Sequence, residues 1–253
     1  MFIHDISPIL LDLNFFQIRW YGLMYLISFI ITYFFILKFS KDFGIKLDKN
    51  KTADLLLYFA AGMIICSRLV YTMFYKPDFY LSNPVEILKV WKGGLSFHGG
   101  LIGIILGGWI FCKRNKIPFL KLADLVSIPA SIGLFFGRVG NFINGELVGR
   151  ITDVPWCFKF KNFDGCRHPS QLYEAFKNLM IFGVLFYYKD KKKPDGFLFF
   201  LLIIMYSVLR SIIEMYRQYD RIILGMTEGQ FLNVFLLVFG VVGMYLIYKN
   251  ESK

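Results

Sequence analysis

The sequence has few charged residues and no polar stretch long enough to fold as a separate soluble domain. Only 19% of its 253 residues are Asp, Glu, Lys or Arg, whereas 56% are hydrophobic, and the mean hydropathy is +0.52. The charged fraction lies below that of an ordinary soluble domain, and the hydrophobic fraction and the mean hydropathy lie above it. The longest connection between apolar windows, about 141–170, is too short to bury a core of its own. The sequence therefore indicates an integral membrane protein.

Signatures of several other protein classes are also missing. The histidines and carboxylates show no metal-ligand spacing, and the glycine-rich segments lack the lysine of a phosphate-binding loop. No internal repeat or linker-like tract divides the chain, and the first residues lack the cationic start of a cleavable signal peptide. We therefore expect no metal and no other cofactor, and a single integral membrane domain over 1–253.

The four cysteines follow no metal-binding pattern either. Cys66 and Cys112 lie in apolar windows, where we expect small core residues. Cys157 and Cys166 share the 141–170 connection and could form a disulfide there.

Seven windows approach the roughly 20 apolar residues that a helix needs to cross the hydrocarbon core. They are about 20–38, 54–75, 95–112, 122–140, 171–188, 197–214 and 230–248. The predicted fold is therefore all-α: a polytopic bundle of seven transmembrane helices with a small loop region outside the membrane.

The net charge of +11 arises from basic residues that gather in alternate loops. Lysines and arginines cluster at 38–51, 113–121, 189–193 and the C-terminus, and they are sparser in the other loops. Short, strongly basic loops remain in the cytoplasm. We therefore expect the N-terminus and the 141–170 loop to be extracytoplasmic and the C-terminus to be cytoplasmic. The expected partner of the basic surface is the lipid bilayer, and no nucleic acid is expected to bind.

Four basic residues nevertheless remain inside the apolar windows: Arg68, Arg138, Lys177 and Arg210. Charge within a bilayer is costly, so such residues face the bundle interior and mark function. With the predicted orientation, polar residues of six helices fall in the outer half of the membrane. They are Tyr21, Arg68, His98, Arg138, Asn141, Glu174, Arg210 and Glu214. This convergence indicates a site in the outer leaflet.

An arginine at this depth has lipid phosphate as its nearest anionic partner, because guanidinium binds phosphate bidentately and stays charged. Tyr206, Arg210 and Glu214 recur every four residues and form one helix stripe. Glu214 could pair with Arg210 or with Arg138 and merely fix the helix, but one arginine would still need an anion. We therefore expect two arginines to hold a phosphate and to stabilise its charge as an ester leaves.

His98 lies between two glycine pairs and is the candidate base at neutral pH. His4 is near the terminus, and His168 lies beside the outer loop, so both have weaker claims. A structural role for His98, as a hydrogen-bonded residue at a helix end, stays open.

Five sequence segments together resemble the prolipoprotein diacylglyceryl transferase family. They are WYGLMY at 20–25, GGLSFHGG at 93–100, GRVGNFINGELVG at 137–149, HPSQLYEA at 168–175, and the stripe of Tyr206, Arg210 and Glu214. The resemblance implies a seven-helix enzyme of the bacterial inner (plasma) membrane. It would transfer the diacylglyceryl group of phosphatidylglycerol to the lipobox cysteine thiol of a prolipoprotein signal peptide and release glycerol phosphate, the first step of lipoprotein maturation.

The resemblance also implies the site residues. They are Tyr21, His98, Arg138, Asn141, Glu146, Gly149, Tyr206, Arg210 and Glu214. A thiol of pKa about 8.5 is mostly protonated near neutrality, so His98 would take its proton while Arg138 and Arg210 hold the phosphate. Tyr21 and Asn141 would donate hydrogen bonds to head-group oxygens, and Glu146 would orient an arginine.

The sequence departs from the family at two places. The loop between Gly149 and His168 is short, and Tyr219 stands where proline is common.

Two other classes of membrane protein remain as alternatives. A transporter or channel also buries charge, but it is expected to carry polar residues through the full membrane depth, whereas the inner halves of these helices are almost purely apolar. A scaffold protein would not need His98, two arginines and Glu146 at one depth. The pattern thus favours the transferase.

Overall fold

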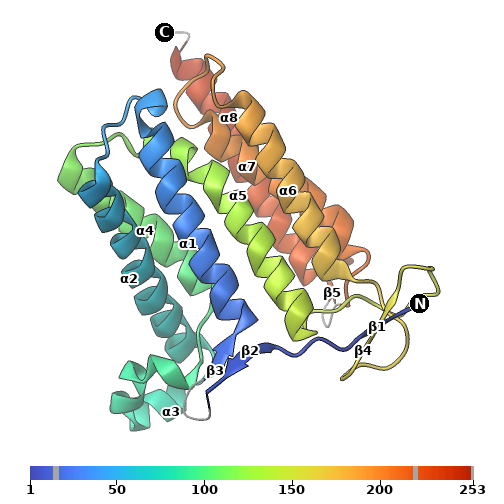
Figure 1. Ribbon diagram of the computed structural model, residues 1–253. Coiled ribbons are helices and arrows are strands. Elements are labelled where there is room, and N and C mark those ends of the chain that lie inside the picture. Colours follow the sequence, from blue (N-terminus) through green and yellow to red (C-terminus); the bar gives the residue numbers. More distant parts are fainter. Residues whose placement is uncertain (14–16, 219–221, 252–253) are drawn as a thin grey trace. The chain divides into compact units, whose positions relative to one another are not determined.

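The computed structural model describes residues 1–13, 17–218 and 222–251 of the chain, which are mostly helical (Figure 1). The long helices in these ranges are α1 (Trp20–Phe39), α2 (Lys49–Phe74), α4 (Phe97–Asn115), α5 (Phe119–Asn144), α6 (Ser170–Tyr188), α7 (Phe197–Glu214) and α8 (Glu228–Glu251). The short ones are η1 (Ser40–Phe43), α3 (Pro77–Ser82), η2 (Pro84–Leu88) and η3 (Val90–Lys92). Each long helix overlaps one of the predicted windows.

Five helices in the described ranges are long and apolar enough to cross a membrane: α1, α2, α5, α7 and α8. Large apolar side chains are exposed along them, among them Phe34 (61%), Phe235 (60%) and Val238 (56%). Such a surface suits lipid and not water. The chain is therefore a multi-pass, mainly helical membrane protein, and the crossing of α4 and α6 stays a prediction.

Short strands also occur, which an all-α prediction does not include. β1 (Phe2–His4) pairs in parallel with β4 (Phe158–Phe160), and β2 (Ile9–Asp12) pairs antiparallel with β3 (Gln17–Arg19). β5 (Ile222–Ile223) and β6 (Met226–Thr227) form a small antiparallel pair. All of these strands lie outside the long helices. Tyr219, where the sequence departs from the family pattern, lies outside the described residues.

The chain divides into two compact units. Unit one contains Met1–Phe35 and Ala123–Lys253, and unit two contains Ile36–Leu122. The boundaries fall inside α1 and α5, not in a linker. A single domain over 1–253 stays a prediction.

In unit two, α2 and α4 pack closely along a row of glycines. Gly99, Gly103 and Gly107 recur every four residues on α4, and a β-carbon at Gly103 would collide with the backbone of Gly62 on α2. Small residues at this spacing let two helix backbones approach each other, as is common in membrane proteins.

Arg68 of α2, one of the four intramembrane basic residues, is bound by backbone within the same unit. It is 4% exposed and donates to the carbonyl oxygens of Glu86 (2.5 Å), Ile87 (2.9 Å) and Gly93 (2.5 Å). Glu86 and Ile87 lie in η2 and Gly93 follows η3, so all three carbonyl groups belong to the connection between α3 and α4. Arg68 thus fixes the segment between α3 and α4.

In unit one, α6, α7 and α8 lie side by side (Figure 1). The carboxylate of Asp124, near the start of α5, accepts the backbone N–H groups of Gly196 (2.7 Å) and Phe199 (2.9 Å) and so caps the N-terminus of α7. Near the other end of α5, the Tyr21 ring of α1 lies against Gly140, where a β-carbon would be 2.8 Å from the ring.

The loop between α5 and α6 is tied to unit one at several points. Cys157 and Cys166 form a disulfide, as their sequence positions suggested. The backbone N–H of Gly149 donates to His168 (3.0 Å), and Arg167 donates to Gly149 O (3.1 Å) and to Gln218 Oε1 (2.8 Å). The loop is therefore held against the start of α6 and the segment that follows α7.

Candidate functional site

Six charged side chains of unit one form a network of ion pairs, here called the charge cluster. Its members are Arg138 on α5, Glu174 and Lys177 on α6, Arg210 and Glu214 on α7, and Arg217 just after α7. Their side chains are between 0% and 17% exposed. Of the polar residues predicted to meet, Arg138, Glu174, Arg210 and Glu214 therefore belong to one network within this unit.

Glu174 is the centre of the charge cluster and has no exposed surface. Its Oε2 lies 2.7 Å from Lys177 Nζ and 3.8 Å from Arg138 Nε, and its Oε1 lies 2.9 Å from Arg210 Nη1. A buried carboxylate is tolerated when several cations surround it in this way. Glu174 thus brings the two predicted phosphate-binding arginines together.

Glu214 is the second carboxylate of the cluster. Its Oε2 pairs with Arg210 Nη1 and lies 3.6 Å from Arg217 Nε. Of the two partners considered for Glu214 from the sequence, the structure therefore selects Arg210. A β-carbon at Gly229 would be 2.6 Å from Glu214 Oε1, so the first turn of α8 closes over this carboxylate.

The charge cluster carries more positive than negative charge. Four cations (Arg138, Lys177, Arg210 and Arg217) face two carboxylates (Glu174 and Glu214), which leaves an excess of two positive charges. Burial lowers the pKa of Arg217 to about 10, so its guanidinium is still charged at neutral pH. An excess of buried positive charge favours the binding of an anion.

Arg138 is the arginine of the cluster with the weakest attachment to protein. Its 3.8 Å contact with Glu174 is too long for a hydrogen bond. In the described part of the chain, no hydrogen bond of its guanidinium is found. Its donors are thus available for a ligand.

Asn141, one turn after Arg138, is held by Glu146. The Asn141 amide donates to Glu146 Oε1 (2.8 Å), and so does the amide of Asn144 (3.1 Å). The sequence predicted that Glu146 orients an arginine, whereas its carboxylate here accepts two amides. The turn after α5 brings these side chains together, which helix spacing alone does not show.

The remaining predicted residues of unit one also lie around this end of the helices. The Tyr21 hydroxyl is 3.2 Å from that of Tyr25, and Lys177 Nζ lies 3.8 Å from the centroid of the Tyr206 ring. Gly149 has no room for a side chain, because a β-carbon would be 2.6 Å from the carbonyl oxygens of His168 and Tyr216.

His98 belongs to unit two, in the first turn of α4, and it is exposed. The turn is fixed by Ser96, whose backbone N–H donates to Ser67 O (3.0 Å). The other two histidines take part in packing: His4 lies against Phe142 and His168 against Tyr216. Burial and the nearby Arg150 lower the pKa of His168, which keeps it neutral at pH 7. His98 therefore stays the candidate base.

Sequence reasoning placed Glu174 at the depth of the site without giving it a role, and it marked Lys177 only as an intramembrane basic residue. Both were recognised as polar residues of one apolar window, and their spacing of three residues matches a pair on one helix face. That spacing was the available signal. Their contact with Arg138 and Arg210 requires three helices to meet and could not be derived from it.

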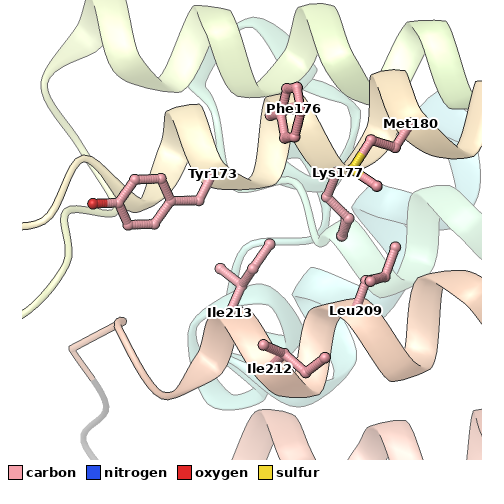
Figure 2. A pocket seen from close by; sticks show the side chains of 7 residues that line it. All are labelled: Tyr173, Phe176, Lys177, Met180, Leu209, Ile212 and Ile213. Atoms are coloured by element: carbon pink, nitrogen blue, oxygen red, sulfur yellow. The ribbon is translucent and has the colours of Figure 1, made fainter.

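A cavity of about 290 Å³ lies between α6 and α7 (Figure 2). It is lined by Tyr173, Phe176, Lys177, Met180, Leu209, Ile212 and Ile213. Lys177 is therefore shared by the cavity and the charge cluster. Within the described ranges, no three His, Cys, Asp or Glu side chains gather where they could hold a metal ion.

Comparison with known proteins shows similarity over nearly the whole chain. Residues 8–246 match the family model of prolipoprotein diacylglyceryl transferase. A relative from Rickettsia bellii (strain OSU 85-389), named phosphatidylglycerol–prolipoprotein diacylglyceryl transferase, is 41% identical over 98% of this chain and 97% of its own length. Relatives of the same name from Geobacter sulfurreducens and Rickettsia typhi are 42% and 40% identical, over 89% and 100% of this chain and 87% and 100% of their own lengths.

Proposed function

The chain belongs to the prolipoprotein diacylglyceryl transferase family, and we propose that it transfers the diacylglyceryl group of phosphatidylglycerol to a prolipoprotein. The acceptor is the lipobox cysteine of the signal peptide. The observation that carries this proposal is the buried charge cluster with its excess of two positive charges.

The chemistry of the transfer suits this excess. The cysteine thiolate attacks the glycerol carbon that bears the phosphate ester, so a carbon–sulfur bond forms and the carbon–oxygen bond breaks. The electron pair of that bond leaves on the phosphate oxygen, and the phosphodiester with one negative charge becomes a monoester that can carry two. Positive charge that is already in place stabilises the leaving group more than it stabilises the bound lipid.

The contacts of the site residues support the following roles in this proposal. Arg138 and Arg210 hold the phosphate, and Asn141, fixed by Glu146, donates to head-group oxygens together with Tyr21. Glu214 and Tyr206 position Arg210 and Lys177.

Two further residues complete the assignment. Gly149 lets the loop pass close to His168 and Tyr216. His98 takes the proton of the thiol.

The membrane arrangement is part of the proposal. α4 and α6 join the five apolar helices to give seven crossings of the bacterial inner (plasma) membrane, with the N-terminus and the α5–α6 loop outside and the C-terminus in the cytoplasm. The basic loops at 38–51, 113–121 and 189–193 support this orientation.

A reconstituted assay tests the activity. The purified protein in vesicles that contain phosphatidylglycerol should add a diacylglyceryl mass to a lipobox peptide and release glycerol phosphate. Vesicles of phosphatidylcholine alone and a peptide with serine in place of cysteine are the matched controls. An unmodified peptide in the presence of folded protein would contradict the proposal, and solute flux across the same vesicles would favour a transporter.

A further inference from the structure

We infer that Lys177 is a positioning residue that occupies Glu174 and thereby keeps Arg138 available for the phosphate of the lipid. This inference rests on the proposed function and deepens it. It concerns a residue that takes no direct part in the reaction described above.

The geometry shows a competition for one carboxylate oxygen. Glu174 Oε2 accepts a charged hydrogen bond from Lys177 Nζ at 2.7 Å, and the same oxygen lies 3.8 Å from Arg138 Nε. The lysine is one turn after Glu174 on α6, whereas the arginine comes from α5. Because Lys177 satisfies Oε2, the arginine is attracted to the carboxylate without being bound by it.

The placement of Lys177 fits this function and not that of a phosphate ligand. Its side chain is 2% exposed, and its ammonium group lies between Glu174 Oε2 and the ring of Tyr206, 3.8 Å from the ring centroid. Its methylene groups lie among the apolar side chains of the α6–α7 cavity, near Met180 and Leu209 (Figure 2). The ammonium group is thus already engaged on two sides.

Loss of the lysine charge should redirect Arg138. Glu174 has no exposed surface, so an oxygen without a partner there is strongly unfavourable. A shift of about 1 Å would bring Arg138 Nε within hydrogen-bond distance of Oε2. The arginine would then be bound to protein, and phosphate would lose one of its two guanidinium partners.

The test compares Lys177→Met with the double variant Lys177→Met/Glu174→Gln in the reconstituted transfer assay. Lys177→Met should raise the KM for phosphatidylglycerol at least about tenfold, the worth of one charged hydrogen bond. In the double variant the KM should return most of the way to the wild-type value. The side-chain oxygen of glutamine can still accept a hydrogen bond from Arg210, but without the negative charge it no longer attracts Arg138 as a carboxylate does. Lys189→Met, at the other end of α6, is the matched control and should keep the wild-type KM.

The possible outcomes separate the inference from its alternatives. If the KM for phosphatidylglycerol rises in Lys177→Met and stays as high in the double variant, the lysine binds substrate directly. A lower kcat with unchanged KM, together with reduced thermal stability, would show a merely structural role. Unchanged kinetics in Lys177→Met would overturn the inference while the activity of the wild-type protein still supports the transferase. An inactive wild-type protein would refute the proposed function itself.

Discussion

Two arginines of equal charge are held very differently in the charge cluster. Arg210 contacts both carboxylates, whereas the single carboxylate contact of Arg138 in the described ranges is the long one to Glu174. The spacing of Tyr206, Arg210 and Glu214 left the Arg210–Glu214 pair as one of two possibilities, and the structure contains it. The difference between the arginines was not predictable, because it depends on Lys177 and Glu174 of another helix. Individual roles therefore follow from contacts across helices.

Arg138→Lys should lose most of the transfer activity while the protein still folds. Lysine keeps the charge but not the planar fork that binds two phosphate oxygens. Because Arg138 is only weakly attached to the rest of the protein, the substitution should change the stability of the fold little. We expect a drop in kcat/KM of roughly 10²-fold, as for the loss of one preorganised donor. Initial transfer rates measured with protein matched for thermal stability provide the check, and near wild-type turnover would show that the fork is not needed.

His98→Gln should lower the chemical rate by about 10²- to 10⁴-fold if His98 is the general base. Raising the pH toward the thiol pKa of about 8.5 should partly restore the rate, because thiolate then forms without the imidazole. Single-turnover transfer to a lipobox peptide across pH, together with lipid binding, measures both effects. Weak lipid binding without rescue at high pH would assign His98 to lipid positioning instead.

At the scale of the helices, hydrophobic length predicted where each one lies but not where it ends. The window 197–214 coincides with α7, whereas α5 continues from the predicted 140 to Asn144 and α2 begins at Lys49 instead of 54. Polar residues do not end a helix that has left the hydrocarbon region, since water or other side chains can pair with their hydrogen-bonding groups.

Arg68 shows a similar limit of reasoning from sequence alone. Sequence marked it as a polar residue of the outer-leaflet site, and the backbone carbonyls that bind it became visible only in the structure.

Asp124→Ala should destabilise the protein by about 1–2 kcal/mol, because it removes the side-chain cap from two N–H groups of α7. The midpoint of thermal unfolding in detergent should fall. The KM for phosphatidylglycerol should stay unchanged at a temperature where the variant is folded, since α5 separates Asp124 from Arg138 by about 20 Å.

Asp190→Ala serves as the control for this variant. Asp190 pairs with Lys189 at an exposed position, where the ion pair contributes at most about 1 kcal/mol. Equal destabilisation by the two variants would show that the cap is unimportant.

For the molecule as a whole, the distribution of charge predicts which loops face which side of the membrane. A membrane-impermeant maleimide should label Asp153→Cys in intact cells and should label Lys191→Cys only after the membrane is opened. The chain without an added cysteine controls for reaction at Cys66. Labelling of Lys191→Cys from outside intact cells would contradict the predicted topology. It would also contradict the prediction that the site lies in the outer leaflet.

The pairing of β1 with β4 bears on the order in which the protein assembles. Phe2 pairs with Phe158, so the ribosome completes α1, α2, α4 and α5 before the partner of the first strand exists. Contacts between such distant parts of a chain form slowly. The early segment must therefore remain unpaired until α5 has been inserted and the following loop has emerged. Pairing of these strands is therefore a late step of biogenesis, which follows synthesis of the first four long helices.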